Sequence, residues 1–396
     1  MSSIELRNQR IDCLRGLAIG CVLLLHFMLA YGLKDSLLGS LLSASLLGAL
    51  ARNGNYGVTM FFVVSGFLIV SQSLRRWGSL PAIDIRAFYV QRFARIMPLL
   101  LPTLALIVAL GSLGLPHFSN TDGGHHLPAL YFWLAAGSVL TFWHNLLMQS
   151  VGYFNYCLNV YWSLSVEEVF YLALPLLCLA LRRTWLLAAV CLLLIVAGPV
   201  YRAAHLDNEI DYLYGNLACF DAIAIGCLAA LAAHRVRLAD GRARLLRWAG
   251  LLMLGGVYLR GIAGNQVFGF SWVALASAAF LLGASRAPWL DGWRERATRP
   301  LRWLGRHSYE LYLLHIVMLA GLRNLLPKGS IGYWERLPLL CAFVAASALL
   351  AYLAARYWSE PCNRAIRRRW LGRRGEDNAR LSAEWGSFWH DGSRYR

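Results

Sequence analysis

The sequence predicts an all-α integral membrane protein, a bundle of about ten transmembrane helices, from its composition, its apolar runs and its charge pattern. Of its 396 residues, 58% are hydrophobic and 15% are charged, whereas soluble domains carry about 25% charged residues. Apolar runs of bilayer-spanning length recur along the whole chain. The net charge of +17 comes from short basic clusters between these runs. This arrangement is typical of cytoplasmic loops, so it favours a membrane protein over a nucleic-acid-binding protein.

The basic clusters also predict the direction of each span. Because Lys and Arg concentrate in cytoplasmic loops, the alternation of basic and neutral loops places both termini in the cytoplasm. The transmembrane domain is expected to cover residues 1–371, and the polar residues 372–396 are predicted to form a disordered cytoplasmic tail. The predicted spans are residues 10–33, 56–74, 96–115, 162–181, 184–204, 216–233, 248–262, 269–285, 308–326 and 337–358.

One apolar segment, residues 127–149, leaves two threadings open. It is apolar enough to span a bilayer, and so is the segment at residues 162–181. If both crossed, the pair Arg182 and Arg183 would face outward and every later basic loop would be inverted. A re-entrant or interfacial segment near residues 127–149 instead keeps this pair in the cytoplasm, and irregular backbone is tolerated where protein or water satisfies it. We therefore expect this segment not to cross.

The first span carries the ionisable residues around which the functional prediction is arranged. Arg15 and His26 are eleven positions apart, so on a helix they lie within roughly 20° around the axis and about 16 Å apart along it. Asp12 precedes Arg15 by three residues and can pair with it. A lone buried histidine in a soluble helix is more often a hydrogen-bonded core residue. Inside a membrane an ionisable group is costly, so His26 is interpreted as functional.

Basic and small residues in the second and third spans are further candidates. Arg92 and Arg95 are three positions apart, on one helix face at the cytoplasmic mouth of the third span. Their planar guanidinium groups suit the phosphates of an anionic cytosolic cofactor, and positive flanking of the span explains them equally well. Ser65 precedes Gly66 in mid-span, where close helix packing and a ligand contact remain equal alternatives.

Acidic and aromatic residues gather near the outer start of the fourth predicted span. Glu167 and Glu168 follow Trp162, and because adjacent helical residues point about 100° apart, only one acid need face the interior. Interfacial aromatics explain the tryptophan but not the acids, which favours a functional role. His315, in the ninth span, is either a second functional imidazole or a bundle hydrogen bond, and Asp221 is a weaker candidate of the same kind. The nine cysteines show no metal-binding spacing, so no metal is expected.

Five motifs taken together resemble the membrane-bound acyltransferase-3 family. Each motif alone is weak, but the five occur in the family's order and cover nearly all of residues 10–360. They are D-x-x-R-G-x-A ending in His (residues 12–26), F-F-V-x-S-G-F-L-I (61–69), R-x-x-R-I-x-P (92–98), W-S-L-x-V-E-x-x-F-Y (162–171) and S-Y-x-L-Y-L-x-H (308–315).

The resemblance implies a ten-span O-acyltransferase in the bacterial inner membrane. Such an enzyme takes an acyl group, commonly acetyl from acetyl-CoA on the cytoplasmic side, and delivers it to a hydroxyl of a glycan or other acceptor outside. It also implies that Arg15 and His26 are essential and that Arg92 and Arg95 match the family's basic element. Two departures stand out: Leu100 stands where the family often has an aromatic residue, and we expect no esterase-like domain after the last span.

The residues and the resemblance agree on a mechanism. A hydroxyl is a poor nucleophile, and general-base catalysis by an imidazole typically contributes about 10²–10⁴-fold. We hypothesise that neutral His26 takes the acceptor's proton during attack on the thioester, without a metal; an acyl-His26 intermediate is the alternative. Arg15 would position the CoA end, with Asp12 holding it, and Glu167 would face the acceptor.

The expected roles divide into three groups. The catalytic residues are His26, Arg15, Asp12 and Glu167; the acyl-CoA-binding residues are Arg92, Arg95, Arg15 and Ser65; the acceptor-binding residues are Trp162, Glu168, His315 and Asp221. The expected partners are membrane lipid and a glycan or other hydroxyl acceptor, not nucleic acid.

The competing class of function is a proton-coupled transporter, in which intramembrane His, Glu and Asp act as relay or substrate residues. The absence of repeated halves in the sequence and the arginine pair disfavour it.

Overall fold

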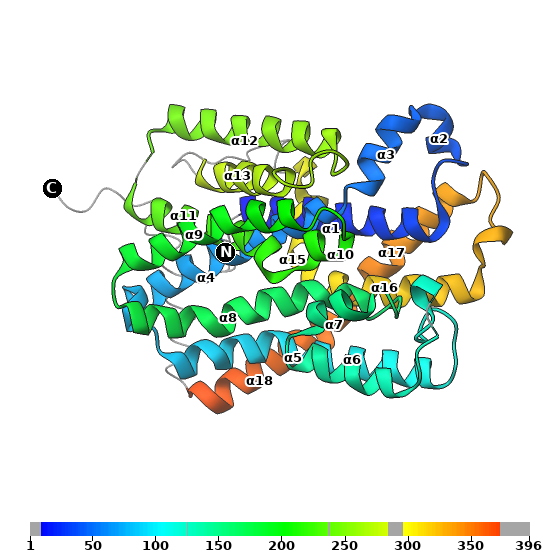
Figure 1. Cartoon of the computed structure of the whole chain (residues 1–396), viewed down its shortest axis with the longest axis horizontal. Coiled ribbons are helices and arrows are strands. Elements are labelled where there is room, and N and C mark those ends of the chain that lie inside the picture. The colour runs from blue at the N-terminus through cyan, green and yellow to red at the C-terminus, as the bar shows by residue number, and fades with distance from the viewer. Residues whose placement is uncertain (1–8, 125, 237, 284–295, 373–396) are drawn as a thin grey trace.

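The structure, a computed structural model, describes residues 9–124, 126–236, 238–283 and 296–372, and every regular element within these ranges is helical. The helices lie side by side along the long axis of the molecule (Figure 1), which confirms the all-α prediction. The predicted tail from residue 373 onward lies outside the described residues. The helices are α1 (Gln9–Tyr31), α2 (Leu37–Leu41), α3 (Ala44–Arg52), α4 (Asn55–Trp77), α5 (Ile85–Ser112), α6 (Leu130–Leu140), α7 (His144–Val151), α8 (Trp162–Leu181), α9 (Thr184–Ala204), α10 (Glu209–Tyr214), α11 (Asn216–Arg235), α12 (Asp240–Arg260), α13 (Gly269–Leu282), α15 (Arg299–Arg306), α16 (Ser308–Leu325), α17 (Arg336–Ala354) and α18 (Glu360–Leu371), with short 3₁₀ turns at Leu80–Ala82, Asp122–Gly124, Asn159–Tyr161 and Lys328–Ser330 and a π turn at Ala355–Ser359.

Seven of the ten predicted spans coincide with helical segments that are long and apolar enough to cross a membrane. These segments are Gln9–Tyr31, Ala44–Trp77, Ile85–Ser112, Asn159–Leu181, Thr184–Ala204, Glu209–Arg235 and Arg336–Leu371. The other three predicted spans fall on α12, α13 and α16, which have 21, 14 and 18 residues. The end of the predicted eighth span, residues 284–285, lies outside the described residues. The ten-span count therefore remains a prediction.

The ambiguous segment at residues 127–149 folds as two short helices, α6 and α7. They have 11 and 8 residues, and the turn between them contains Phe142 with a φ of 64°. A transmembrane helix needs about 20 residues, so neither helix is long enough to cross a bilayer. A broken helix of this kind is compatible with the predicted re-entrant or interfacial placement, which itself remains a prediction.

Helix α5 begins eleven residues before the predicted start of the third span. The side chain of Asp84 accepts a hydrogen bond from the backbone N–H of Ala87 at 2.9 Å, which caps the new helix. The early start places Arg92 and Arg95 inside the helix, as expected for two arginines on one helix face. At these positions Arg92 is partly buried and Arg95 is exposed.

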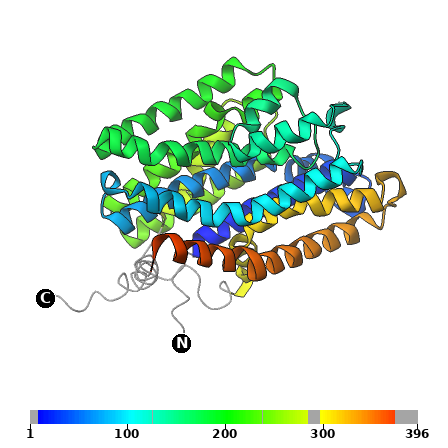
Figure 2. The same cartoon turned by 90° about the horizontal axis from the view of Figure 1, so that it is seen from below.

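The last predicted span also extends beyond its expected end at residue 358. Helix α17 passes through the π turn at Ala355–Ser359 into α18 without a break, and this rod crosses the lower side of the bundle in Figure 2. Its end packs against α5, where the indole Nε1 of Trp358 donates to the carbonyl of Pro98 at 2.6 Å. Because Pro102 has no N–H to bond that carbonyl, the indole satisfies an acceptor that the helix leaves free.

Helix α1 contacts α4, α15 and α16. Glycines permit the closest approaches: a Cβ on Gly16 would overlap the carbonyl oxygen of Leu301, and one on Gly305 would overlap that of Asp12. Helices α4 and α11 pack closely in the same way, through Gly66 on α4 and Gly226 on α11. Small residues at helix contacts are typical of membrane bundles, because apolar lipid gives helices little hydrophobic reason to associate.

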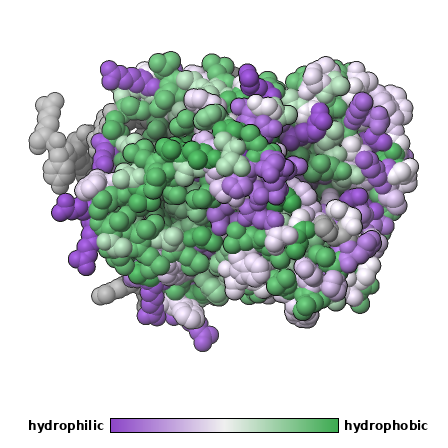
Figure 3. Space-filling model, in the orientation of Figure 1, coloured by the Kyte–Doolittle hydropathy of each residue, from purple (hydrophilic) through white to green (hydrophobic). Residues whose placement is uncertain are grey.

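The outer face of the bundle is apolar where α8 and α9 lie. Figure 3 shows a broad hydrophobic surface over these helices, with polar residues toward both ends of the long axis. Such a surface is unfavourable in water and suits contact with lipid. Its exposed large side chains include Leu172, Leu176, Leu179, Leu192, Leu193, Val196 and Val200.

Candidate active site

His26 on α1 and His315 on α16 lie against each other inside the bundle. Their ring centroids are 4.9 Å apart, and Nε2 of His315 is 3.2 Å from Nδ1 of His26. His315 is fully buried, whereas His26 is partly exposed. From the helix rise, His26 is about 25 Å from the first residue of α1 and about 8 Å from its last. The packing of α16 on α1 thus joins two histidines whose contact was not predicted from the sequence.

The hydrogen-bond partners of the two rings fix their tautomers. Nδ1 of His315 lies 2.9 Å from the carbonyl oxygen of Leu311, and Nδ1 of His26 lies 2.9 Å from that of Val22. A carbonyl only accepts, so each neutral ring carries its hydrogen on Nδ1 and leaves Nε2 as an acceptor. The Nδ1–H of His26 is shared between the Val22 carbonyl and Nε2 of His315. Within the described chain, Nε2 of His26 has no hydrogen-bond partner, so it is available as a base.

Tyr312, one helical turn before His315, forms part of the wall beside the pair. Its ring centroid is 5.9 Å from that of His315 and 6.3 Å from that of Phe61 on α4. Its hydroxyl donates to the carbonyl of Val160 at 2.9 Å and lies 2.6 Å from Oγ of Ser163. These contacts fix α16 against α4 and the start of α8 beside the histidines.

The predicted arginine pair lies over aromatic rings. The guanidinium of Arg92 is 4.3 Å from the centroid of Tyr171, and that of Arg95 is 5.9 Å from the centroid of Tyr309. Neither arginine forms an ion pair or hydrogen bond with any residue in the described ranges. Each guanidinium thus makes a cation–π interaction with a tyrosine ring. The N–H groups of both arginines remain free to bind an anion.

Tyr171 connects three residues that the sequence assigned to different roles. Its hydroxyl donates to the Glu167 carboxylate and accepts from Oγ of Ser65, while its ring lies under the Arg92 guanidinium. Ser65 and Arg92 were expected to bind acyl-CoA, and Glu167 was expected to face the acceptor. The structure places all three around a single tyrosine.

The two adjacent acids differ as the helix geometry requires. Glu168 is only 6% exposed and its Oε1 has no hydrogen-bond partner in the part of the chain that the structure describes, whereas Glu167 is partly exposed. A buried carboxyl oxygen without a partner is costly. Glu168 is therefore the acid that faces the interior, and it is available to a hydrogen-bond donor.

Asp12 forms an ion pair that the sequence did not predict. Its fully buried carboxylate lies 3.4 Å from Nε of Arg306 on α15. Arg15, its expected partner, is 9% exposed and lies one turn further along α1. Asp12 thus helps to fix the start of α1 against α15.

The model of one protein family matches residues 8–356 of the chain. This is the acyltransferase-3 family, described as an acyltransferase domain. The chain belongs to this family. The match covers the histidine pair, the arginine pair and both acids, and it confirms the resemblance shown by the five sequence motifs.

Among curated relatives, this acyltransferase-3 chain is similar to proteins named as O-acetyltransferases. It is 24% identical over 89% of its length to "Peptidoglycan O-acetyltransferase OatA" of Listeria monocytogenes, of which 55% is covered. It is 26% identical over 78% to "Putative peptidoglycan O-acetyltransferase YrhL" of Bacillus subtilis, of which 51% is covered. It is 22% identical over 78% to "O-acetyltransferase OatA" of Staphylococcus aureus, of which 52% is covered. The chain thus spans about half the length of these relatives, and no solved structure matches it.

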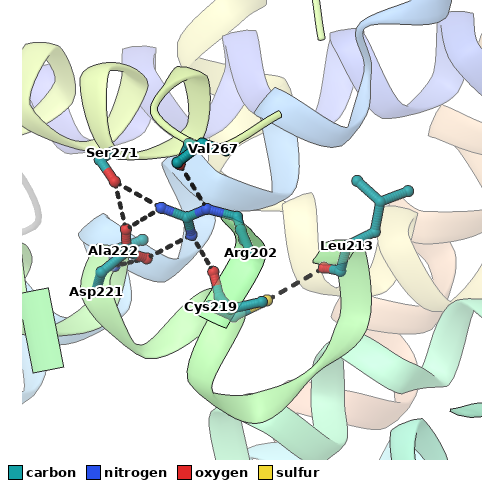
Figure 4. Close-up of polar contacts among 8 residues, drawn as sticks. Arg202, Leu213, Cys219, Asp221, Ala222, Val267 and Ser271 are labelled. Atoms are coloured by element: carbon teal, nitrogen blue, oxygen red, sulfur yellow. Dashed lines mark hydrogen bonds and ion pairs between the residues drawn. The ribbon is translucent and has the colours of Figure 1, made fainter. Parts of the chain in front are cut away.

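The acyltransferase-3 chain also contains a second buried polar cluster, around Arg202 on α9 (Figure 4). This guanidinium pairs with the Asp221 carboxylate of α11 at 2.8 Å, and both residues are fully buried. It also donates to Oγ of Ser271 at 2.6 Å, to the carbonyl of Val267 at 2.8 Å and to that of Ala218. Asp221, expected to bind the acceptor, is thus already neutralised by an arginine.

Trp162 lies near this cluster. Its ring centroid is 4.3 Å from that of Tyr214, and a small pocket is lined by Trp162, Asp221, Tyr212 and Phe270, among others. Two residues expected to bind the acceptor therefore share a pocket, and neither His26 nor His315 is among the residues that line it. No group of three or more His, Cys, Asp or Glu side chains in the described ranges is placed to hold a metal ion.

Sequence reasoning missed Tyr171, Tyr312 and Arg202 as site residues. Both tyrosines belong to motifs quoted for the family, but aromatic residues in a span are usually packing residues. Arg202 carried a detectable signal: a cation near the end of an apolar span, with an acid in another span, implies a buried pair.

Proposed function

We propose that the chain is an integral membrane O-acetyltransferase that moves acetyl from acetyl-CoA to a hydroxyl of a cell-wall glycan. Its acyltransferase-3 membership supports the reaction class. The printed names of its relatives, peptidoglycan O-acetyltransferases among them, support acetyl as the group and a cell-wall glycan as the acceptor. The unpartnered Nε2 of His26 carries the proposal, because acyl transfer to a hydroxyl requires a base at the reacting oxygen.

In the proposed reaction, Nε2 of His26 accepts the proton of the acceptor hydroxyl while the hydroxyl oxygen attacks the thioester carbonyl carbon. The C–S bond then breaks, and the same proton passes from Nε2 to the departing CoA sulfur. The products are the acetyl ester and CoA with a free thiol, so His26 returns to its starting state. A route through acetyl-His26 reaches the same products in two steps.

The basic residues at one end of the bundle fit an anionic donor such as CoA. The free N–H groups of Arg92 and Arg95 match phosphate oxygens, and Ser65 and Tyr171 lie beside Arg92 on the way into the bundle. Arg15 is proposed to act near the thioester, and Glu167 and Glu168 to contact the acceptor. In Arg15→Lys the charge stays but the planar fork is lost, so we expect impaired activity.

The proposed orientation places the end that carries Arg75, Arg76 and Arg235 in the cytoplasm, by the positive-inside rule. The loop between α5 and α6 then lies outside. His126 in this loop is exposed, so a membrane-impermeant maleimide should label His126→Cys in intact cells whose native exposed cysteines have been replaced. Labelling only after the cells are opened would invert the orientation.

The proposed reaction is tested with purified protein in detergent, radiolabelled acetyl-CoA and a soluble glycan oligomer. We expect label to move to the glycan and to be released by mild base, as for an ester. A matched comparison of cell-wall glycan from cells with and without the chain should show an acetyl-sized mass difference. If the glycan gains no label and the cell walls show no mass difference, acyl transfer is contradicted. The alternative of a proton-coupled transporter would then be favoured.

A further inference from the structure

The hydrogen bonds of the histidine pair run in one direction. The Leu311 carbonyl accepts from Nδ1–H of His315, so Nε2 of His315 has no hydrogen and faces Nδ1 of His26 at 3.2 Å. The Nδ1–H of His26 therefore donates to His315. Backbone carbonyls place the hydrogen of both rings on Nδ1, Leu311 for His315 and Val22 for His26, so the contact between the rings can run in this direction only.

The residues around His315 leave its Nε2 free to accept the hydrogen bond from His26. His315 is fully buried, and the nearby Tyr312 hydroxyl is occupied by Val160 and Ser163. Its Nε2 thus has no competing donor from that tyrosine. A fully buried ring is also poorly placed to contact a glycan, which argues against the acceptor-binding role expected from the sequence.

We propose that His315 is a positioning residue for the base: it accepts the Nδ1–H of His26, so that the unprotonated Nε2 of His26 faces the reacting hydroxyl. This inference rests on the proposed acyl transfer. It assigns His315 no contact with either substrate. Its effect is exerted through the orientation and tautomer of a second imidazole.

The same hydrogen bond becomes stronger during the reaction. When Nε2 of His26 takes the hydroxyl proton, the ring becomes an imidazolium and its Nδ1–H a charged donor. Charge-assisted hydrogen bonds are about twice as strong as neutral ones. His315 therefore stabilises the transition state more than the resting state, so its removal should lower kcat and leave the KM for acetyl-CoA unchanged.

The decisive experiment compares His315→Gln with His315→Asn. The glutamine amide reaches about where Nε2 of histidine lies, so it can accept from His26, whereas the asparagine amide reaches only the Nδ1 position beside Leu311. Losing a hydrogen bond to a charged group costs about tenfold to a hundredfold. We expect that loss of kcat in His315→Asn and in His315→Leu, and clearly higher kcat in His315→Gln.

A purely structural role gives a different pattern. It predicts that activity per folded molecule stays normal in all three variants, while folded yield and thermal midpoint fall with the packing change. Equal kcat in His315→Asn and His315→Gln would overturn the positioning role. If His315→Leu folds too poorly to measure, the asparagine and glutamine variants still distinguish a positioning role from a structural one, because they differ by only one methylene.

A double variant separates this inference from the proposed function. If His315 acts through His26, then His26→Ala with His315→Asn should be no slower than His26→Ala alone. An additional loss in the double variant would contradict positioning. Absence of acetyl transfer by the wild-type protein would instead contradict the proposed function. Wild-type transfer with normal kcat in His315→Asn would overturn only the role of His315.

Discussion

Two buried polar clusters in this bundle differ in how completely their hydrogen bonds are satisfied. In the first, Asp221 accepts from the Arg202 guanidinium, the Ser271 hydroxyl and a backbone N–H, and Arg202 donates further to two carbonyls. In the second, every hydrogen bond of His26 uses Nδ1, and Nε2 stays without a partner in the described ranges. A saturated cluster holds helices together, whereas an unsaturated one has a group left for chemistry. Polarity inside the membrane does not by itself distinguish the two.

The largest effect is expected when the unsaturated cluster loses its base. His26→Ala should reduce acetyl transfer by about 10²–10⁴-fold, the usual contribution of a general base, because no other group replaces Nε2. The folded yield should stay near that of the wild type, since removing a costly intramembrane imidazole need not weaken the bundle. The measurement is turnover per folded molecule after size-exclusion chromatography. Near-normal turnover would end the assignment of His26 as the base.

Breaking the saturated cluster should have the reverse result. Arg202→Met leaves the Asp221 carboxylate buried without its cation, which costs about 3–5 kcal/mol of stability. We expect a sharply lower thermal midpoint and folded yield, with normal turnover in the molecules that remain folded. The control, Arg202→Met with Asp221→Leu, removes both charges and should recover stability. A raised KM for the glycan in folded Arg202→Met would instead support the acceptor-binding role of Asp221.

A third buried imidazole allows the effect of protonation on stability to be tested. His144 on α7 is fully buried with its Nδ1 2.8 Å from Oγ of Ser138, and burial lowers its pKa from its ordinary value of 6.5 to about 4. Protonation therefore favours the unfolded chain, and the stability due to neutral His144 is complete above pH 6.5. It is lost as the pH falls toward 4, in total about 3 kcal/mol at about 1.4 kcal/mol per pH unit.

His144→Asn keeps a group near the Nδ1 position and does not titrate. We expect its thermal midpoint to fall less than that of the wild type between pH 6.5 and 4, with similar turnover at neutral pH. If the thermal midpoints of the two proteins fall in parallel as the pH is lowered, His144 is not the source of the stability lost in acid.

The smallest expected effect concerns the donor site. Arg92→Gln removes one guanidinium that we propose to bind phosphate, and a lost charge-assisted hydrogen bond costs about 1.5–3 kcal/mol, or about tenfold to a hundredfold in affinity for acetyl-CoA. The matched control is Arg86→Gln on the same helix, because Arg86 is exposed and one to two turns closer to the helix start. The affinity for acetyl-CoA is measured by calorimetry. Equal affinity in the two variants would show that Arg92 does not bind the donor and serves only as a positive flank of the span.

The sequence was sufficient for the all-helical class, the family and the positions of most of the long apolar helices, because apolar runs are local features. It also placed Glu167 and Glu168 on different faces. It could not predict the contact of His26 with His315 or of Arg202 with Asp221, since these depend on how distant helices pack. The contact of Arg306 on α15 with Asp12 likewise joins distant helices, so the spacing of residues on α1 could not predict it. Local spacing finds polar residues, and tertiary packing decides which of them meet.

The glycine contact between α4 and α11 has a mechanical consequence. A Cβ on Gly66 would overlap the carbonyl oxygen of Ile223, and one on Gly226 would overlap that of Val63, so the two backbones touch from both sides. Sliding or rocking one helix on the other would drive backbone atoms into each other, and α4 and α11 must therefore move as one body. Phe61 and Ser65, which α4 places against Tyr312 and Tyr171, are therefore held in a fixed position relative to α11.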